Sequence, residues 1–298
     1  MDFYFPGEIL GLRPPNDFQK IGAKIRKGLP ISCLNRFQKL SGASDGEARH
    51  ILWMTEKELL ARKRKGSLSS RESDRLFSAA EFLCSVFCFS RKGRISEDVI
   101  RFLHRPIAAD LPVPLIRLMG TEAGLDLADA VLSGTYRQDY LRKFLPKKLK
   151  NKKRCPSPRV TRYADPLYII GMSRKKDMDR EIRKGFPSKA YDTLLEKTRI
   201  ARRKVNRILW LSPKALAEQK NAGRLSPDAS NRLYRLSWIY FLLMDWTDND
   251  PAEGIQWLNH NEYHLLGKTP YEVLADAPGS AAVDNILWHI TEGFPSGL

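Results

Sequence analysis

The hexapeptide IRKGLP at residues 25–30 recurs as IRKGFP at residues 182–187, which is 157 residues further along the chain. The same offset holds without a gap from residue 25 to residue 79, and 17 of these 55 positions carry identical residues. Self-similarity over so long a period indicates a duplicated domain rather than a solenoid of short repeats. The 298-residue chain is long enough for two such domains, each with its own core.

The two copies extend beyond this segment with small shifts in register. The stretch PGEILG at 6–11 resembles PLYIIG at 166–171, and PVPLIRL aligned with KTPYEVL places Pro114 on Pro270. From these matches we predict repeat one at 1–139, a linker at 140–165 and repeat two at 166–298. Each repeat divides further into a first part, at 25–90 or 182–245, and a second part, at 95–139 or 250–298.

The charge of the chain is its most informative bulk property. Lys and Arg exceed Asp and Glu by 17, and the sequence pI is about 9.8. Such an excess favours a polyanionic partner, most often nucleic acid. Ten Lys or Arg and no acid lie between residues 142 and 162, where two prolines and a lack of apolar periodicity predict an extended linker. We expect this linker to contact phosphates through Lys147, Lys148, Lys150, Lys152, Lys153 and Arg154.

Both repeats are predicted to be all-α. Thr55 followed by Glu58 is typical of a helix-starting capping box, and the matched positions in repeat two hold Ser212 and Pro213, a different pair of helix-starting residues. The next helix starts twice in the same way, with Ser69 and Glu72 in repeat one and Ser226 and Pro227 in repeat two. Each repeat is thus expected to hold a short helix (48–53 or 205–210), a tight turn, a second helix (56–65 or 213–222) and a longer core helix.

A short helix, a turn and a second helix are typical of a helix-turn-helix, although any small helical bundle shares the pattern. If it is a helix-turn-helix, the second helix is the recognition helix. In repeat one that helix is strongly basic and suits phosphate and guanine contacts. In repeat two the matched helix is nearly neutral, although Gln219 and Asn221 suit adenine edges. The predicted DNA-binding side chains are Lys57, Arg62, Lys63, Arg64 and Lys65.

Other chemistry has weak support in the sequence. The stretch HNEYH at 260–264 spaces two His like a zinc protease motif, but Glu262 stands third rather than second, where that motif's general base would be. No phosphate-binding, nucleophile-elbow or dinucleotide-binding pattern occurs, so we expect no enzyme activity, no cofactor and no metal. The four Cys lack CxxC spacing and are expected to be free thiols. The sequence contains no apolar run of about 18 residues or more, so we expect no membrane span.

The order of motifs resembles that of antitoxins of the Xre/MbcA/ParS class. Repeat one holds ILGL, IRKGLP and TEKELLARKRKGSLSSRESDRLFSAA, and repeat two holds IRKGFP, SPKALAEQKNAGRLSPDASNRLYRL and WLNHNEYHLLGKTPYEVL. The segment ESDR is intact at 72–75 but is changed to ASNR at 229–232, whereas the closing motif is fuller in repeat two. The resemblance covers nearly the whole chain except the linker.

This resemblance implies a toxin–antitoxin component with a helix-turn-helix that binds double-stranded operator DNA. It also implies that the second part of each repeat is a helical toxin-binding part, whose last segment blocks a RES-type toxin that consumes NAD. Members of the class are about half this length and act as dimers, so the duplicated chain is expected to be a monomeric pseudo-dimer in the bacterial cytoplasm. The partner-binding residues implied are Trp288, Ile290, Glu292, Gly293 and Phe294.

Two function classes remain open at this point. One is a DNA-binding repressor that neutralises a toxin. The other is an adaptor or scaffold that uses the duplicated helical part for protein contacts, while the basic linker grips RNA or DNA without sequence preference. Preference for a particular operator sequence would distinguish the first from the second. A hydrolase with a metal at His260 and His264 is a weaker third possibility, which bound metal would reveal.

Overall fold

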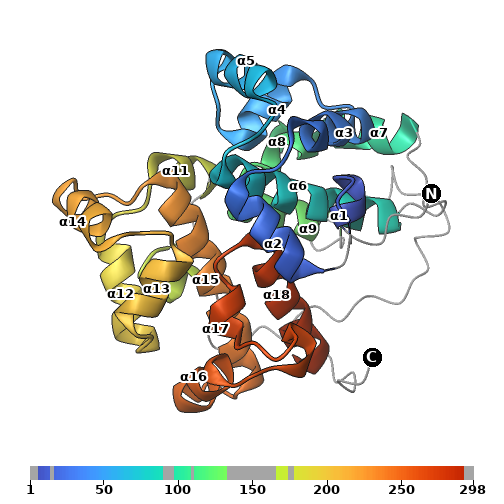
Figure 1. The fold of residues 1–298 in the computed structure, drawn as a ribbon. Helices are drawn as coiled ribbons and strands as arrows, with labels where there is room; N and C mark the ends of the chain where they lie inside the picture. Colours follow the sequence, from blue (N-terminus) through green and yellow to red (C-terminus); the bar gives the residue numbers. More distant parts are fainter. Residues whose placement is uncertain are drawn as a thin grey trace. The chain divides into compact units, whose positions relative to one another are not determined.

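The computed structural model describes residues 6–13, 17–89, 97–108, 111–132, 166–173 and 178–291. The all-α prediction is confirmed, because the described residues form helices and turns apart from one pair of short antiparallel strands. The chain divides into two compact units (Figure 1), namely residues 1–16 with 27–160, and residues 17–26 with 161–298. Residues 17–26, assigned to repeat one by sequence, therefore group with the second unit. The predicted domain boundaries otherwise stay a prediction, and the linker lies almost wholly outside the described residues.

The first unit is built around one long helix, α6 (Ser70–Phe89), whose described side chains are mostly buried. Short helices pack against it, and β1 pairs with β2 in an antiparallel register that aligns Pro106 with Pro114. The other elements are α1 (Pro6–Ile9), α3 (Ile31–Ser41), α4 (Asp45–Leu52), α5 (Glu56–Lys65), α7 (Glu97–His104), β1 (Pro106–Ala108), β2 (Leu111–Pro114), α8 (Leu115–Leu118) and α9 (Glu122–Leu132).

The second unit has the same plan around α15 (Pro227–Trp246), which packs against α18 (Ala277–Thr291) and α11 (Met178–Lys184). Helix α2 (Phe18–Lys27) lies beside α18 in Figure 1, and Arg26 forms an ion pair with Asp276 just before that helix. The other elements are η2 (Pro166–Tyr168), α12 (Lys189–Thr198), α13 (Arg202–Ile208), α14 (Pro213–Asn221), α16 (Pro251–Asn259), η3 (Tyr263–Leu265) and α17 (Pro270–Val273).

The four predicted helix starts are confirmed. The Thr55 hydroxyl accepts from the Glu58 amide, and the Glu58 carboxylate accepts from the Thr55 amide at 2.7 Å. Ser212 and Ser226 cap α14 and α15 through their hydroxyls, each with Pro at the first helical turn. The starts of the two short helices were predicted three residues too late: α4 begins at Asp45, after a capping box of Ser44 and Glu47, and α13 begins at Arg202.

The repeated hexapeptide owes its glycine to a close backbone approach. Gly28 and Gly185 have φ of +94° and +82°, a region that favours glycine. A Cβ on Gly28 would lie 2.2 Å from the Leu68 carbonyl oxygen, and one on Gly185 would lie 2.0 Å from that of Leu225. The amides of the same two leucines donate to the residues that follow the glycines, Leu29 and Phe186. The motif therefore recurs because each unit needs the same backbone clamp beside its long core helix.

Candidate nucleic-acid interface

The turn between the two short helices is built alike in both units. Trp53 ends α4 and Trp210 follows α13, and both adopt left-handed φ values, 55° and 56°. The Arg75 guanidinium lies 3.9 Å from the Trp53 ring centroid, and that of Arg232 lies 3.6 Å from the Trp210 ring centroid. Since Arg75 and Arg232 belong to the long core helices, stacking between cation and ring ties each turn to its core helix. The second short helix of each pair is therefore held at a defined angle.

A serine on each core helix completes this framework. The Ser73 hydroxyl accepts from the buried Leu29 amide at 2.8 Å, and the Ser230 hydroxyl accepts from the Phe186 amide at 2.7 Å. Each hydroxyl also donates to the carbonyl four residues earlier in its helix. These bonds, the backbone clamp and the tryptophan turns all recur at the 157-residue offset.

Comparison with known protein families gives a match in unit 2. Residues 177–237, which include α11 to α14 and the first half of α15, match the family model described as antitoxin Xre-like helix-turn-helix domain. This segment is thus similar to Xre-like helix-turn-helix domains. No curated protein matches the chain. Because helix-turn-helix domains bind DNA, the match supports a DNA-binding regulator of the antitoxin class.

In this matched segment α13 and α14 occupy the places of the first and second helices of a helix-turn-helix, and α4 and α5 occupy the same places in unit 1. The structure divides the five predicted cations of α5 into two groups. Lys57, Arg64 and Lys65 are exposed, and none of them makes a hydrogen bond or ion pair within the described part of the chain. They are the side chains of α5 that are available to phosphates or base edges.

The other two cations of α5 serve the fold. The Arg62 guanidinium contacts both carboxylate oxygens of Glu72, with Nε 2.8 Å from Oε2. Glu72 in turn accepts from the Ser69 amide at the start of α6. The ammonium of Lys63 lies 2.7 Å from Asp45 Oδ2. The hydrogen bonds that the Arg62 guanidinium donates to Glu72 raise the pKa of Arg62.

Helix α14 of unit 2 is joined to the start of its core helix by different residues. Gln219 stands where repeat one has Arg62, and Ala229 stands where it has Glu72. The Gln219 side-chain oxygen accepts directly from the Ser226 amide at 2.8 Å. Gln219 is therefore occupied at the base of α15 and is poorly placed for the adenine contact that its residue type suggests. Asn221 is exposed at the end of α14.

The remaining predicted site residues fall near or beyond the limits of the described chain. The linker cations from Lys147 to Arg154 lie outside the described residues, as do Glu292, Gly293 and Phe294. Trp288 and Ile290 belong to α18, where Ile290 is partly exposed and the Trp288 side chain is not described. These DNA-binding and partner-binding assignments stay predictions.

The HNEYH stretch forms a tight loop around η3. The Glu262 amide donates to the Lys268 carbonyl, and the rings of Tyr263 and His264 meet edge to face. Among the residues that the structure describes, no group of three or more His, Cys, Asp and Glu is placed to hold a metal ion. Over the same residues, no helix has the length and hydropathy needed to cross a membrane. Cys33 and Cys84 are buried, and the Cys88 side chain and Cys155 are not described.

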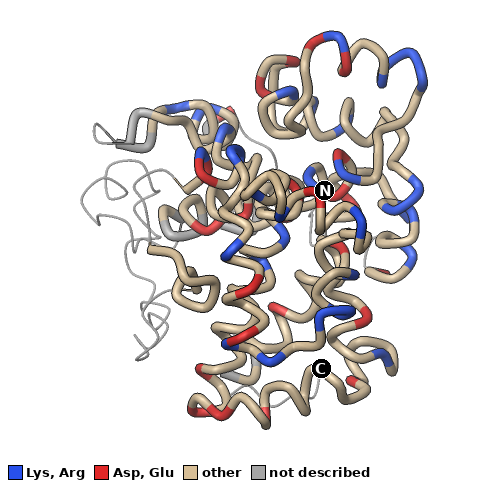
Figure 2. Tube along the Cα trace, turned by 90° about the vertical axis from the view of Figure 1, so that its left-hand side faces the viewer, with Lys and Arg blue, Asp and Glu red and all other residues tan. Residues whose placement is uncertain are grey.

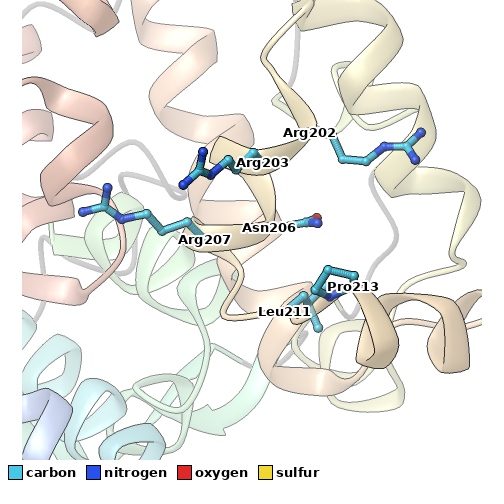
Figure 3. Close-up of a pocket in the computed structure, with 6 residues that line it drawn as sticks. All are labelled: Arg202, Arg203, Asn206, Arg207, Leu211 and Pro213. Atoms are coloured by element: carbon cyan, nitrogen blue, oxygen red, sulfur yellow. The ribbon is translucent and has the colours of Figure 1, made fainter.

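The cations of α13 were not among the predicted DNA-binding residues. Arg202, Arg203 and Arg207 are exposed, and Asn206 is partly exposed beside them. An open pocket is lined by Arg202, Arg203, Asn206, Arg207, Leu211 and Pro213 (Figure 3). The run RRKVNR at 202–207 was the available signal, but the predicted short helix began at residue 205 and none of these cations was predicted to bind DNA. Basic positions occur throughout both units (Figure 2), so a single cluster of this kind does not stand out in a sequence of such high charge.

Proposed function

We propose that this protein is a DNA-binding repressor of the antitoxin class, built as a fused pseudo-dimer whose two helix-turn-helix units both contact operator DNA. The match of residues 177–237 to the Xre-like domain carries the proposal for unit 2. For unit 1 the support is the recurrence, at the same offset, of the tryptophan turn, the serine bond and the glycine clamp. The net charge of +17 agrees with a polyanionic partner.

The experiment that tests DNA binding is selection from a pool of randomised duplexes, followed by anisotropy titration of the enriched sequence and of a random-sequence duplex. A repressor enriches one sequence and binds it roughly 10³-fold or more tightly than the random duplex. Equal affinity for every duplex would contradict the repressor and favour the adaptor. The titrations need a stated salt concentration, because affinity for a polyanion falls steeply with salt.

We also propose that the protein neutralises an NAD-degrading RES-type toxin in the bacterial cytoplasm, without catalysis of its own. The support is the resemblance of the closing segment WHITEGFPSGL to the part that blocks the toxin in that class of antitoxin. Deletion of residues 292–298 should abolish inhibition of a co-expressed RES-type enzyme, measured as NAD consumption. DNA binding and the melting temperature should stay unchanged, because a terminal segment contributes little to the fold unless it docks.

A protein-binding adaptor is the second candidate, and one observation favours it. Tyr263 and Leu266 in unit 2 are 86% and 64% exposed, although both are large and apolar. Leu266 also adopts a left-handed φ of 57°, which is costly for a residue with a branched side chain. Exposed aromatic and aliphatic side chains of this kind often anchor a protein partner. If Tyr263→Ala blocks toxin inhibition and leaves DNA binding intact, this loop belongs to the toxin-binding surface and the two functions coexist.

A further inference from the structure

The two helix-turn-helix units carry their positive charge on different helices. Residues 45–58, from α4 into α5, hold four acids and two cations, whereas the matched residues 202–215 hold five cations and no acid. At the end of the second helix the contrast is reversed. Residues 59–66 hold four cations and no acid, whereas the matched residues 216–223 hold one of each. Relative to repeat one, repeat two has its charge on the first helix of the motif instead of the recognition helix.

The acids of repeat one are replaced position by position. Asp45 corresponds to Arg202, Glu47 to Lys204, Glu56 to Pro213 and Glu58 to Ala215. The ion pair that Asp45 makes with Lys63 is kept in repeat two by another acid, because Lys220 lies 2.5 Å from Asp192 on α12. Position 202 is thereby released from a structural role.

Three arginines of α13 line the open pocket. Arg202 and Arg203 make no hydrogen bond or ion pair in the part of the chain that the structure describes. Arg207 donates to the Glu272 backbone carbonyl at 3.3 Å, which leaves other donors of its guanidinium available. In Figure 3, Arg203 and Arg207 extend to one side of α13, and Arg202 and Asn206 to the other. No carboxylate lines the pocket, so its side chains offer donors to an anion.

A buried tyrosine orients the amide of Asn206. The fully buried Tyr191 hydroxyl donates to Asn206 Oδ1 at 2.5 Å. With its oxygen engaged, Asn206 presents its amide NH₂ group as a donor beside the arginines. Repeat one has Leu34 and Arg49 at the matched positions, so it lacks both the hydroxyl and the amide. The donor arrangement on α13 is therefore particular to repeat two.

We infer that Arg202, Arg203, Asn206 and Arg207 bind phosphodiester oxygens of the DNA backbone, so that repeat two anchors the DNA while repeat one reads its bases. This inference rests on the proposed DNA-binding function. In a helix-turn-helix the first helix crosses the sugar-phosphate backbone, which is where α13 lies in the motif. Arginine suits this role because its planar fork matches the geometry of phosphate oxygens. Contacts to phosphate fix position and affinity but carry no sequence information.

The inference predicts a loss of affinity without a loss of specificity. The full-length protein would be titrated against fluorescein-labelled duplexes, one of random sequence and one enriched by selection, over a series of KCl concentrations. Each phosphate contact contributes about 0.9 to the slope of log K against log salt. Arg203→Gln should lower that slope by about one for both duplexes, and their affinity ratio should stay as in the wild type. Arg202→Asp, which installs the repeat-one residue, should act in the same direction and more strongly.

A matched control removes a cation from the same unit at another place. Lys268→Gln, at the exposed end of the η3 loop, should leave the salt slope within error of the wild type. Circular dichroism melting of each variant checks that the unit stays folded, which is expected because Arg202 and Arg203 are exposed and unpaired within the described chain. A wild-type slope in both α13 variants would overturn the inference, and so would an equal fall in the Lys268 variant.

Two further outcomes separate this inference from others. If the wild-type protein binds neither duplex at low salt, the proposed DNA-binding function fails, and the α13 inference fails with it. If the wild type binds DNA and the α13 variants bind it equally well but no longer inhibit a co-expressed toxin, the surface serves an acidic protein. In that case the inference is wrong while the proposed function stands.

Discussion

At the scale of single residues, the repeated hexapeptide depends on its glycine for two separate reasons. Gly28 needs a positive φ, and it also needs the absence of a Cβ, because that atom would lie 2.2 Å from a backbone oxygen. Gly66, at the end of α5, has a φ of +79° but has nothing within 4 Å of the place where its Cβ would be. Substitutions at Gly28 and Gly66 therefore distinguish the cost of a positive φ alone from the added cost of a steric clash.

We predict that Gly28→Ala is far more damaging than Gly66→Ala. Gly66→Ala, the control, should lower the free energy of unfolding by about 1 to 2 kcal/mol, the usual penalty for a left-handed residue with a Cβ. Gly28→Ala adds a backbone clash that breaks the clamp to Leu68, so unit 1 should lose its cooperative transition. Urea unfolding followed by circular dichroism measures both. Similar costs for the two variants would show that the clamp is not needed.

The exchange of Arg62 and Glu72 for Gln219 and Ala229 leads to a second prediction. Arg62→Ala leaves Glu72 without its guanidinium at a largely buried position, where the loss of a charged hydrogen bond costs about 1.5 to 3 kcal/mol. The double variant Arg62→Gln with Glu72→Ala copies repeat two, in which the amide oxygen accepts from the helix start directly.

Thermal melts should therefore show that the double variant is more stable than Arg62→Ala, despite carrying one change more. Random-duplex affinity should fall little in the double variant, because Arg62 is engaged by Glu72 in the native fold. A double variant less stable than the single one would mean that the two repeats do not share this interaction.

At the scale of elements, local chemistry determined how much could be predicted. Helix starts at Thr55, Ser69, Ser212 and Ser226 were predictable, because a capping residue satisfies amides within its own turn. The tryptophan turns and the assignment of residues 17–26 to unit 2 were not, because they depend on side chains or chain segments far apart in sequence.

The candidate site was predictable only in part for the same reason. Residue type alone could not show that Arg62 and Lys63 are held by Glu72 and Asp45, whereas Lys57 and Arg64 are not paired within the described chain. Nor could it show that Asp192 pairs with Lys220 in repeat two, whereas Asp45 pairs with the matched Lys63 in repeat one. Interactions that cross between helices decide which cations remain available.

The capping boxes make the helices sensitive to acid. The backbone amide and hydroxyl of Thr55 hold the pKa of Glu58 below its ordinary value of 4.5. A carboxyl whose pKa is lowered by folding adds stability above its unfolded pKa, and this stability is lost as the pH falls through the folded value. The free energy of unfolding of the wild type should therefore decrease below about pH 4.5. That of the Glu58→Gln variant should decrease less over the same pH range. Urea titrations at pH 6 and pH 3 test this, and parallel losses in both proteins would contradict it.

At the scale of the whole molecule, the duplication that the sequence predicts would allow the two halves to diverge while each keeps its framework. The bonds that position the helices recur at the same offset, whereas the charges that meet a ligand do not. In a homodimer both recognition helices are necessarily identical, so that the operator mirrors the protein's two-fold symmetry. A single chain that carries both units is free of this constraint, and its α5 and α14 present different side chains.

We therefore predict that one chain occupies an asymmetric operator. Dimeric helix-turn-helix proteins place palindromic half-sites about one helical turn apart, or a multiple of it. Here hydroxyl-radical footprinting of the selected duplex should show two protected backbone segments from one bound chain, with base preference concentrated in the segment next to repeat one. Arg64→Gln with Lys65→Gln should relax that preference, because both side chains are exposed on α5. Analytical ultracentrifugation of the complex gives the stoichiometry. A perfect palindrome bound by two chains would instead show that the protein dimerises on DNA as other helix-turn-helix proteins do, and the asymmetric-operator prediction would be wrong.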